Sequence, residues 1–267
     1  MDFSKVKLIV SDMDGTLLND NHEVSDKFYV LFDKLKSNDI HFVAASGRQF
    51  QSIQDKLFDI KNDISIIGEN GGIMQYAHKT KVLLELSKKD VAACVKVLRQ
   101  IENSFTVLCG SKAAYIESRD KSFYKKLKNY YTVVEKVDDL LNVRNDKFLK
   151  IAVFHFDSSE KFIYPSVKKF EGQYQVIVSG QNWLDISHIE ANKAYALKMI
   201  QKEMGITPKE TMVFGDFNND IEMLKLADMS FAMENAHPNV KKTAKFITKS
   251  NNNNGVEEVL DQLLKSY

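Results

Sequence analysis

One stretch near the N-terminus, residues 8–18 (LIVSDMDGTLL), constrains the fold of this chain more than any other. It starts with an apolar, β-branched run and then carries two carboxylates, Asp12 and Asp14, followed by a glycine. Side chains alternate along a strand, so both acids would point the same way if the strand continued, and Gly15 lets the chain turn after them. Two acids at the end of a buried strand are costly unless a cation lies between them. The stretch therefore predicts a buried strand that ends in a divalent-metal site.

Two other interpretations of these acids are weighed against the metal site. A solvated acidic turn after a strand is as compatible with Asp12 and Asp14 alone. A calcium loop of the EF-hand type is a sharper alternative, because four oxygen-bearing side chains have its ligand spacing: Asp12, Asp14, Thr16 and Glu23. It fails because Leu17 occupies the sixth loop position, where glycine is required, and because the preceding segment has the pattern of a strand instead of a helix.

The residues that follow alternate between helical and strand patterns. Ser25 has the character of an N-cap before apolar residues at helical spacing, and residues 40–45 form an apolar run that ends in Ser46-Gly47-Arg48. A short helix is expected at 49–58 and a third strand at 64–67, which leads into GENGG. Such alternation implies a parallel sheet with right-handed crossovers. Ligands of these sheets bind beyond the carboxyl ends of the strands, where all the polar clusters would gather.

From about residue 73 the pattern changes. A hairpin of strands 73–76 and 82–86 is expected, followed by short strands and helices that resemble an antiparallel sheet with helices on one face, including a helix over 159–170. We therefore predict an α/β fold in which a Rossmann-like parallel-sheet core, residues 1–86 and 185–267, carries an inserted α/β domain at residues 87–184.

The alternating pattern returns near the C-terminus. A helix is expected at 192–204, and a strand at 211–214 leads into Gly215-Asp216-Phe217-Asn218-Asn219-Asp220, which opens another helix. Strands at 229–233 and 246–248 and a helix near 256–264 complete the core. Residues 251–254, four consecutive asparagines, are interpreted as a polar loop and not as a functional tract.

Composition excludes several classes of protein. A net charge of +1 with 27% charged residues lacks the basic excess of a nucleic-acid binder. Two cysteines, Cys94 and Cys109, are too few for a disulfide framework. No apolar run approaches the length of a membrane span, and no cleavage site follows the N-terminal apolar patch. We expect a cytoplasmic protein without a nucleic-acid or membrane partner.

Four polar clusters thus lie at predicted strand ends or helix starts, and each alone has a structural explanation, such as a helix cap or a solvated lysine. Together and in order they resemble the motifs of the haloacid dehalogenase superfamily, and within it the Cof-type sugar-phosphatase branch. DMDGTLL is similar to DxDGTL, Ser46 lies in ASGR, Lys193 lies in NKAYAL, and GDFNND is similar to GDxxND. Residues 87–184 resemble the cap domain of that branch. Ala194 departs from the glycine often found after the motif lysine.

The resemblance implies roles for these residues. Asp12 would be the nucleophile that forms an aspartyl-phosphate, and Asp14 the general acid and base. Mg2+ would be held by Asp12, the Asp14 carbonyl and Asp216. The phosphate and the rest of the substrate would contact a larger set: Met13, Thr16, Ser46, Gly47, Arg48, Lys193 and Asn219, with Asn70 and, less strongly, His188 as further substrate candidates. Asp220 would orient Lys193 or its neighbours without contacting the substrate itself.

The same resemblance implies a small phosphorylated metabolite as the partner, with phosphorylated sugars favoured and pyridoxal phosphate or flavin mononucleotide as alternatives. Two other functions stay open at this point. A phosphomutase would use the same aspartates but return the phosphoryl group to its substrate. A non-enzymatic phospho-accepting switch of the receiver type also combines acids, a hydroxyl group and a lysine around Mg2+. The sequence leaves the oligomeric state open.

Overall fold

The computed structural model describes residues 3–266, which form two compact units. The first contains the described residues of Met1–Gly47, Lys56–Thr80 and Asn192–Tyr267, and the second contains Arg48–Asp55 and Lys81–Ala191. The predicted insert, residues 87–184, lies within the long segment of the second unit. The assignment of the two parts as catalytic core and cap domain stays a prediction.

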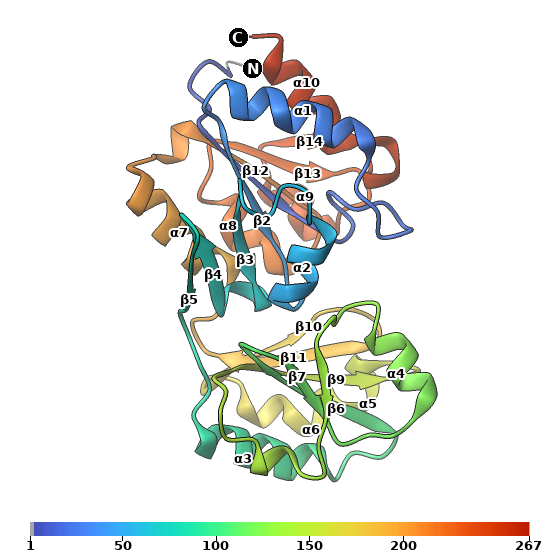
Figure 1. Ribbon diagram of the computed structural model, residues 1–267. Helices are drawn as coiled ribbons and strands as arrows, with labels where there is room; N and C mark the ends of the chain where they lie inside the picture. The colour runs from blue at the N-terminus through green and yellow to red at the C-terminus, as the bar shows by residue number, and fades with distance from the viewer. Residues whose placement is uncertain (1–2, 267) are drawn as a thin grey trace. The chain divides into compact units, whose positions relative to one another are not determined.

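An eight-stranded sheet organises the first unit (Figure 1). Its order is β14-β13-β12-β1-β2-β3-β4-β5. Six strands pair in parallel, and β4 pairs antiparallel with β3. The bounds of the strands are β1 Leu8–Asp12, β2 His41–Ala45, β3 Ser65–Gly68, β4 Ile73–Tyr76, β5 Lys79–Val82, β12 Thr211–Gly215, β13 Met229–Met233 and β14 Phe246–Thr248. The predicted fold class, an α/β protein with a Rossmann-like parallel sheet, is confirmed.

The order of the strands places a switch point between β1 and β12. From β1 the chain steps to β2 and β3 in one direction, whereas from β12 it steps to β13 and β14 in the other. Right-handed crossovers put the connecting helices of the two halves on opposite faces, and in sheets of this kind ligands bind at such a switch point, here the carboxyl ends of β1 and β12. Residues that follow Asp12 and Gly215 therefore lie where ligands bind in such sheets.

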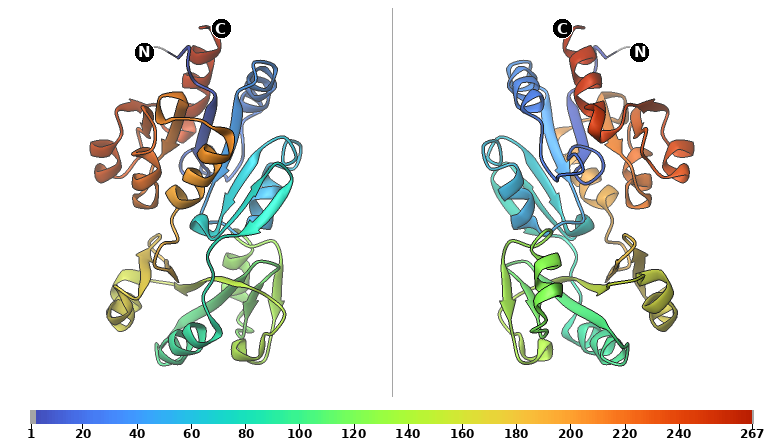
Figure 2. Two further views of the ribbon diagram at one scale, coloured as in Figure 1. Left: turned by 90° about the vertical axis from the view of Figure 1, so that its left-hand side faces the viewer. Right: turned by 90° about the vertical axis from the view of Figure 1, so that its right-hand side faces the viewer.

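Helices of the first unit fall into two groups. Helix α1 (Asp26–Ser37) packs beside α10 (Gly255–Leu264), as both views of Figure 2 show. Helices α7 (Lys193–Met204), α8 (Ile221–Leu224) and α9 (Pro238–Thr243) form the other group. The predicted cap of α1 is confirmed, because the Ser25 hydroxyl accepts a hydrogen bond from the amide of Phe28 at 3.1 Å.

The second unit is built on a six-stranded sheet of order β10-β11-β9-β6-β7-β8. All its pairs are antiparallel except β7 with β8. The strands are β6 Ser104–Gly110, β7 Ala114–Ile116, β8 Val134–Lys136, β9 Phe148–His155, β10 Tyr174–Val178 and β11 Trp183–His188. The helices are α2 Phe50–Lys56, of which Lys56 falls in the first unit, and α3 Lys88–Leu98, α4 Lys121–Leu127, α5 Ser159–Phe162 and α6 Tyr164–Val167.

Three details of the sequence prediction are wrong. Helices cover both faces of the second sheet, because α3 and α6 pack on one apolar cluster and α4, through Phe123 and Leu127, packs on the other. The helix expected over 159–170 is broken into α5, α6 and a 3-10 turn, with Pro165 in the first turn of α6. The hairpin turns at Ala77 and His78, both with positive φ, so its second strand is Lys79–Val82 and not 82–86.

Within residues 3–266, no helix has both the length and the apolar composition needed to cross a membrane. The cytoplasmic location stays a prediction.

Candidate active site

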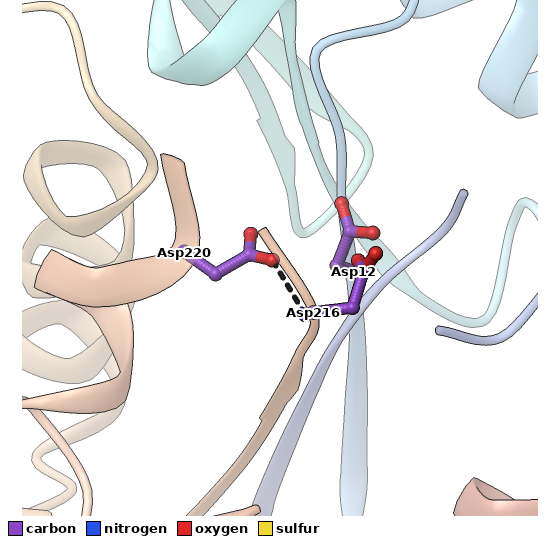
Figure 3. A group of neighbouring side chains, drawn as sticks. All are labelled: Asp12, Asp216 and Asp220. Atoms are coloured by element: carbon purple, nitrogen blue, oxygen red, sulfur yellow. Dashed lines mark hydrogen bonds between the residues drawn. The ribbon is translucent and has the colours of Figure 1, made fainter. Parts of the chain in front are cut away.

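Three carboxylates gather at the carboxyl ends of β1 and β12. Asp12 is the last residue of β1, Asp216 follows β12, and Asp220 ends the 3-10 turn Asn218–Asp220 that leads into α8. One oxygen atom of each lies within 4.8 Å of the others (Figure 3). Asp12 and Asp220 are buried, at 5% and 0% exposed, and Asp216 is partly buried. The switch point of the sheet thus concentrates negative charge in a place with little water.

Lys193 brings the balancing positive charge. It is the first residue of α7, whose N-cap is Asn192; the Asn192 side chain accepts a hydrogen bond from the Tyr195 amide at 2.9 Å. The fully buried Lys193 ammonium donates hydrogen bonds to Asp12 Oδ1 and, at 2.7 Å, to Asp220 Oδ1. A helix that begins at the lysine also accommodates Ala194, because alanine is a strong helix former.

Asp220 has a supporting position. Its Oδ1 accepts from Lys193, and its Oδ2 accepts from the backbone amides of Asp216 at 2.9 Å and Phe217 at 3.1 Å. Figure 3 shows the bond to the Asp216 amide. Both carboxylate oxygens are therefore committed to protein donors. This geometry holds Lys193 and the loop after β12 in place, and it leaves Asp12 and Asp216 as the better candidates for metal ligands.

Burial dominates the electrostatics of the cluster. Burial raises the pKa of Asp12 well above its ordinary value against the opposing attraction of Lys193, and the charges of Asp220 and Asp216 raise it further. Burial, followed by the repulsion of Asp220, raises the pKa of Asp216 to about 7. Burial lowers the pKa of Lys193, but Asp12 and Asp220 raise it by more, so its pKa lies above the ordinary range. The lysine therefore stays charged.

The donor set fits a hard divalent cation. If all three carboxylates are ionised, one ammonium leaves two negative charges uncompensated in a buried site. Carboxylate oxygens are the ligands that Mg2+ prefers. Gly15 also leaves room there: it has a φ of +78°, and a Cβ at this position would lie 2.4 Å from Asp216 Oδ2. Asp12 and Asp216 are thus suited to hold such an ion.

Asp14 lies one turn of the loop further on. Its side chain is about one-third exposed, and its Oδ1 lies 3.3 Å from His22 Nδ1. Asp14 thus differs from Asp12: the first acid is buried against a lysine, and the second faces a wetter region beside an imidazole. That separation suits a group that must exchange protons.

Thr16 and Met13 make contacts inside this loop. The Thr16 hydroxyl donates to Asp216 Oδ1 at 3.0 Å, so here it orients a carboxylate of the cluster. The Met13 carbonyl accepts from the amides of Thr16 at 3.3 Å and Leu18 at 2.8 Å, which closes the turn. The predicted phosphate contacts of Thr16 and of the Met13 amide stay predictions.

Ser46 and Gly47 follow β2 and meet the segment after β3. The Ser46 amide donates to the Ile67 carbonyl at 2.8 Å, and the Asn70 amide donates to the Ser46 carbonyl at 3.1 Å. A Cβ on Gly47 would lie 3.0 Å from Asn70 Oδ1, the same atom that accepts from Asn219 Nδ2 at 3.1 Å. Asn70, in left-handed conformation with a φ of 52°, therefore links two of the motifs.

Two other predicted contacts lie in the second unit. Arg48 donates from Nη1 to the Asn129 carbonyl at 2.6 Å and lies over the Tyr130 ring, with its guanidinium carbon 5.1 Å from the ring centroid. His188, the last residue of β11, accepts from the Glu190 amide at 3.2 Å through Nδ1. Roles for both in substrate binding stay predictions.

Sequence reasoning missed several polar residues, some near the site in the first unit and two in the second unit. His22 gave no local signal beyond its polar surroundings. Asn235 and Asn251 contact the loop after β1 from segments more than 200 residues away. Lys150 and Asp185 form a buried ion pair in the second unit, with Nζ 3.4 Å from Oδ2. A lysine inside an apolar strand pattern was the one available signal for that pair.

Comparison with known proteins identifies a family and several relatives that match this chain. The family model described as haloacid dehalogenase-like hydrolase matches residues 9–260. The Escherichia coli K12 protein named 5-amino-6-(5-phospho-D-ribitylamino)uracil phosphatase YbjI is 36% identical, with 97% of each chain covered. A Bacillus subtilis 168 protein with the same enzyme name, YcsE, is 26% identical over 96% of this chain and 94% of its own.

Solved structures agree on the fold. The crystal structure of SMU.1108c from Streptococcus mutans UA159 superposes with a TM-score of 0.89 at 29% identity, covering 97% of this chain and 99% of that one. The family model spans nearly the whole chain, and the two relatives align over 97% and 96% of it. The predicted enzyme class, a phosphatase, is confirmed, and the chain belongs to the haloacid dehalogenase-like hydrolases.

Proposed function

We propose that this protein is a Mg2+-dependent phosphatase that hydrolyses a primary phosphate ester on a small polyhydroxylated metabolite, through an aspartyl-phosphate on Asp12. The single observation that carries the chemistry is the Lys193 ammonium hydrogen-bonded to Asp12 at the switch point of the sheet. A buried carboxylate beside a cation and at the end of a strand is held rigidly, which an attacking group needs.

In the first step, one oxygen of the ionised Asp12 carboxylate attacks phosphorus as the bond from phosphorus to the ester oxygen breaks. Asp14, in its protonated form, donates its proton to the leaving oxygen, so that an alcohol departs. Lys193 offsets negative charge that would otherwise repel the phosphate from Asp12. Bound Mg2+ would offset charge on the phosphate oxygens, with Asp12, the Asp14 carbonyl and Asp216 as its protein ligands.

In the second step, the Asp14 carboxylate takes a proton from water, and the resulting oxygen attacks phosphorus as the bond to Asp12 breaks. Inorganic phosphate leaves, and Asp14 is protonated again for the next turnover. The polar groups around Asn70, namely the Ser46 hydroxyl, the Gly47 amide and Asn219, are proposed to hold the phosphoryl oxygens through both steps.

The substrate proposal follows from the relatives. Two of them bear the name of a phosphatase for 5-amino-6-(5-phospho-D-ribitylamino)uracil, whose phosphate is carried by a ribityl chain. We propose a substrate of this kind, a phosphorylated sugar or sugar alcohol, with flavin mononucleotide as a chemically related candidate and pyridoxal phosphate as a less similar one. The second unit, as a cap, would contact the part of the substrate beyond the phosphate.

The test is a panel of phosphorylated metabolites in which inorganic phosphate is measured over many turnovers, with Mg2+ and with a chelator in its place. The panel contains flavin mononucleotide, ribose 5-phosphate and pyridoxal phosphate. We expect continuous, Mg2+-dependent release that is fastest with a ribityl or sugar phosphate. Isomerised substrate without phosphate release would identify a phosphomutase instead. The confirmed enzyme class already excludes the non-enzymatic switch.

A second measurement tests the intermediate. The enzyme is mixed with substrate, quenched in acid within milliseconds and digested, and the peptide that contains Asp12 is examined by mass spectrometry for an added phosphoryl group. Phosphate release with no phosphorylated Asp12 peptide, under quench conditions that preserve acyl phosphates, would contradict the proposed route.

A further inference from the structure

The loop that follows β1 is fixed from outside by two asparagines. Asn235, after β13, donates from Nδ2 to the Gly15 carbonyl at 2.8 Å. Asn251, after β14, donates from Nδ2 to the Leu18 carbonyl at 3.0 Å. The two asparagines also contact each other, because the backbone amide of Asn251 donates to Asn235 Oδ1 at 3.1 Å. One connected set of hydrogen bonds therefore reaches the loop at both sides of Thr16.

The loop also has a second attachment from the same tract. Asp20 accepts from Asn251 Nδ2 at 3.2 Å and from Asn252 Nδ2 at 2.8 Å, and its amide donates to Asn252 Oδ1 at 3.0 Å. These bonds, led by that from Asn252, lower the pKa of Asp20, so its carboxylate stays ionised and continues to accept. Asn251 and Asn252, the first two residues of the asparagine tract 251–254, thus contact the loop after β1.

The loop needs such support. Gly15 has no side chain to restrict it, and its φ of +78° is a conformation that an unsupported glycine leaves easily. Asp14 directly precedes this glycine, and it also forms an isolated bridge with Leu18. The carbonyls of Gly15 and Leu18, to which the asparagines bind, therefore border the residue that must present a proton to the leaving group.

We propose that Asn235 and Asn251 are positioning residues that hold Asp14 in the orientation required for proton transfer. Within residues 3–266 their side chains hydrogen-bond to neither Asp12 nor Lys193, so they act through the loop and not on the phosphate. The inference rests on the proposed function, because it assigns a purpose to the orientation of Asp14. A misplacement of about 1 Å at a reacting group can lower a rate by about a hundredfold.

The test compares phosphoenzyme formation from two substrates. Ribose 5-phosphate has a poor leaving group that needs a proton from Asp14, whereas p-nitrophenyl phosphate has a good one that does not. For Asn235→Ala and Asn251→Ala we expect the rate of phosphoenzyme formation, measured by rapid quench, to fall roughly ten- to hundredfold with ribose 5-phosphate and less than about threefold with p-nitrophenyl phosphate. KM for ribose 5-phosphate should stay within about twofold.

The chain offers matched controls. Asn253→Ala removes an amide of the same tract that donates only to the neighbouring Ser250 hydroxyl, at 3.0 Å, and should leave both rates unchanged. Asn235→Asp keeps the acceptor for Asn251 but loses the donor to Gly15, so it should behave like Asn235→Ala. Asn235 is exposed, which makes its variants good candidates to fold even if Asn251→Ala does not.

An equal fall with both substrates, or wild-type rates in a folded Asn235→Ala, would overturn the inference. So would a wild-type rate in Asn235→Asp, because it would show that the bond to Gly15 is not needed. Failure of the proposed function would look different: the unmodified protein itself would form no phosphoenzyme with either substrate.

Discussion

Two lysines are buried among residues 3–266, and they differ in the charge that surrounds them. Lys193 in the first unit is 0% exposed and donates to two carboxylates, with Asp216 close by as a third. Lys150, in β9 of the second unit, is 3% exposed and lies 3.4 Å from Asp185 on β11. Lys193 therefore stands in a cluster with excess negative charge, whereas the pair of Lys150 and Asp185 is electrically neutral.

The difference separates a site that needs a further cation from one that does not. A buried pair of opposite charges satisfies itself and can be replaced by apolar side chains with little loss of stability. A buried cluster with more acids than bases raises the pKa values of its members, or binds a metal, or does both. By this criterion we expect the Lys193 cluster to bind a metal ion, whereas the ion pair of Lys150 and Asp185 by itself gives no reason to expect one.

The largest effect is expected from Asp12→Asn. An amide cannot attack phosphorus, so turnover should fall by at least about a thousandfold, equivalent to about 4 kcal/mol on the barrier. The fold should persist because Lys193 retains Asp220 as a partner. Phosphate release measures the activity, and circular dichroism checks the fold. The exposed Asp33→Asn serves as the control; residual activity of Asp12→Asn within about tenfold of that control would contradict the assignment of the nucleophile.

The second effect is on stability. Lys193→Met leaves at least two buried carboxylates without their cation and should lower the free energy of unfolding at pH 7 by about 3–5 kcal/mol. Mg2+ should restore part of that loss, because it supplies positive charge to the same carboxylates. Lys150→Met should also destabilise, but without recovery in Mg2+. Urea unfolding with and without Mg2+ measures both; equal recovery in the two variants would remove the distinction between the sites.

A third effect concerns pH. The pKa of Asp216 is raised to about 7 in the folded protein, above its ordinary value in the unfolded chain. Its contribution to stability is therefore fully present below about pH 4 and is lost as pH rises to about 7. With a chelator present to remove metal ions, the free energy of unfolding of Asp216→Asn should fall less between about pH 4 and pH 7 than that of the wild type. Mg2+ should flatten the wild-type profile by binding the ionised form; identical profiles for both proteins would argue against the raised pKa.

The smallest effect is expected from removing both members of the buried ion pair of Lys150 and Asp185. The double substitution Lys150→Met with Asp185→Leu removes both members of the pair and should leave the free energy of unfolding within about 1 kcal/mol of wild type, or raise it by about 1–4 kcal/mol. Thermal or urea unfolding provides the measurement, with Lys150→Met as the single-substitution reference. If the double variant is as unstable as Lys150→Met, then removing the unpaired Asp185 charge restores no stability, and the prediction is wrong.

Local patterns in the sequence were sufficient for much of the fold. The strand that ends in Asp12, the N-cap at Ser25 and the end of α7 at Gly205, which adopts the left-handed conformation, are all consequences of neighbouring residues. The resemblance of four motifs to one superfamily also predicted which residues form the site. Local signals failed where the chain turns through an unexpected residue, as at Ala77 and His78.

The tertiary structure alone decided which of these groups meet. Lys193 contacts Asp12 across 181 residues of sequence, and Asn251 contacts Leu18 across 233. Such pairs depend on the order of strands in the sheet, which places the ends of β13 and β14 near the loop after β1, and no periodicity within a segment records that order. The sequence by itself therefore determined the chemistry available to this protein, whereas the packing of the sheet decided how that chemistry is held, because distant segments are brought together only when the whole core is buried.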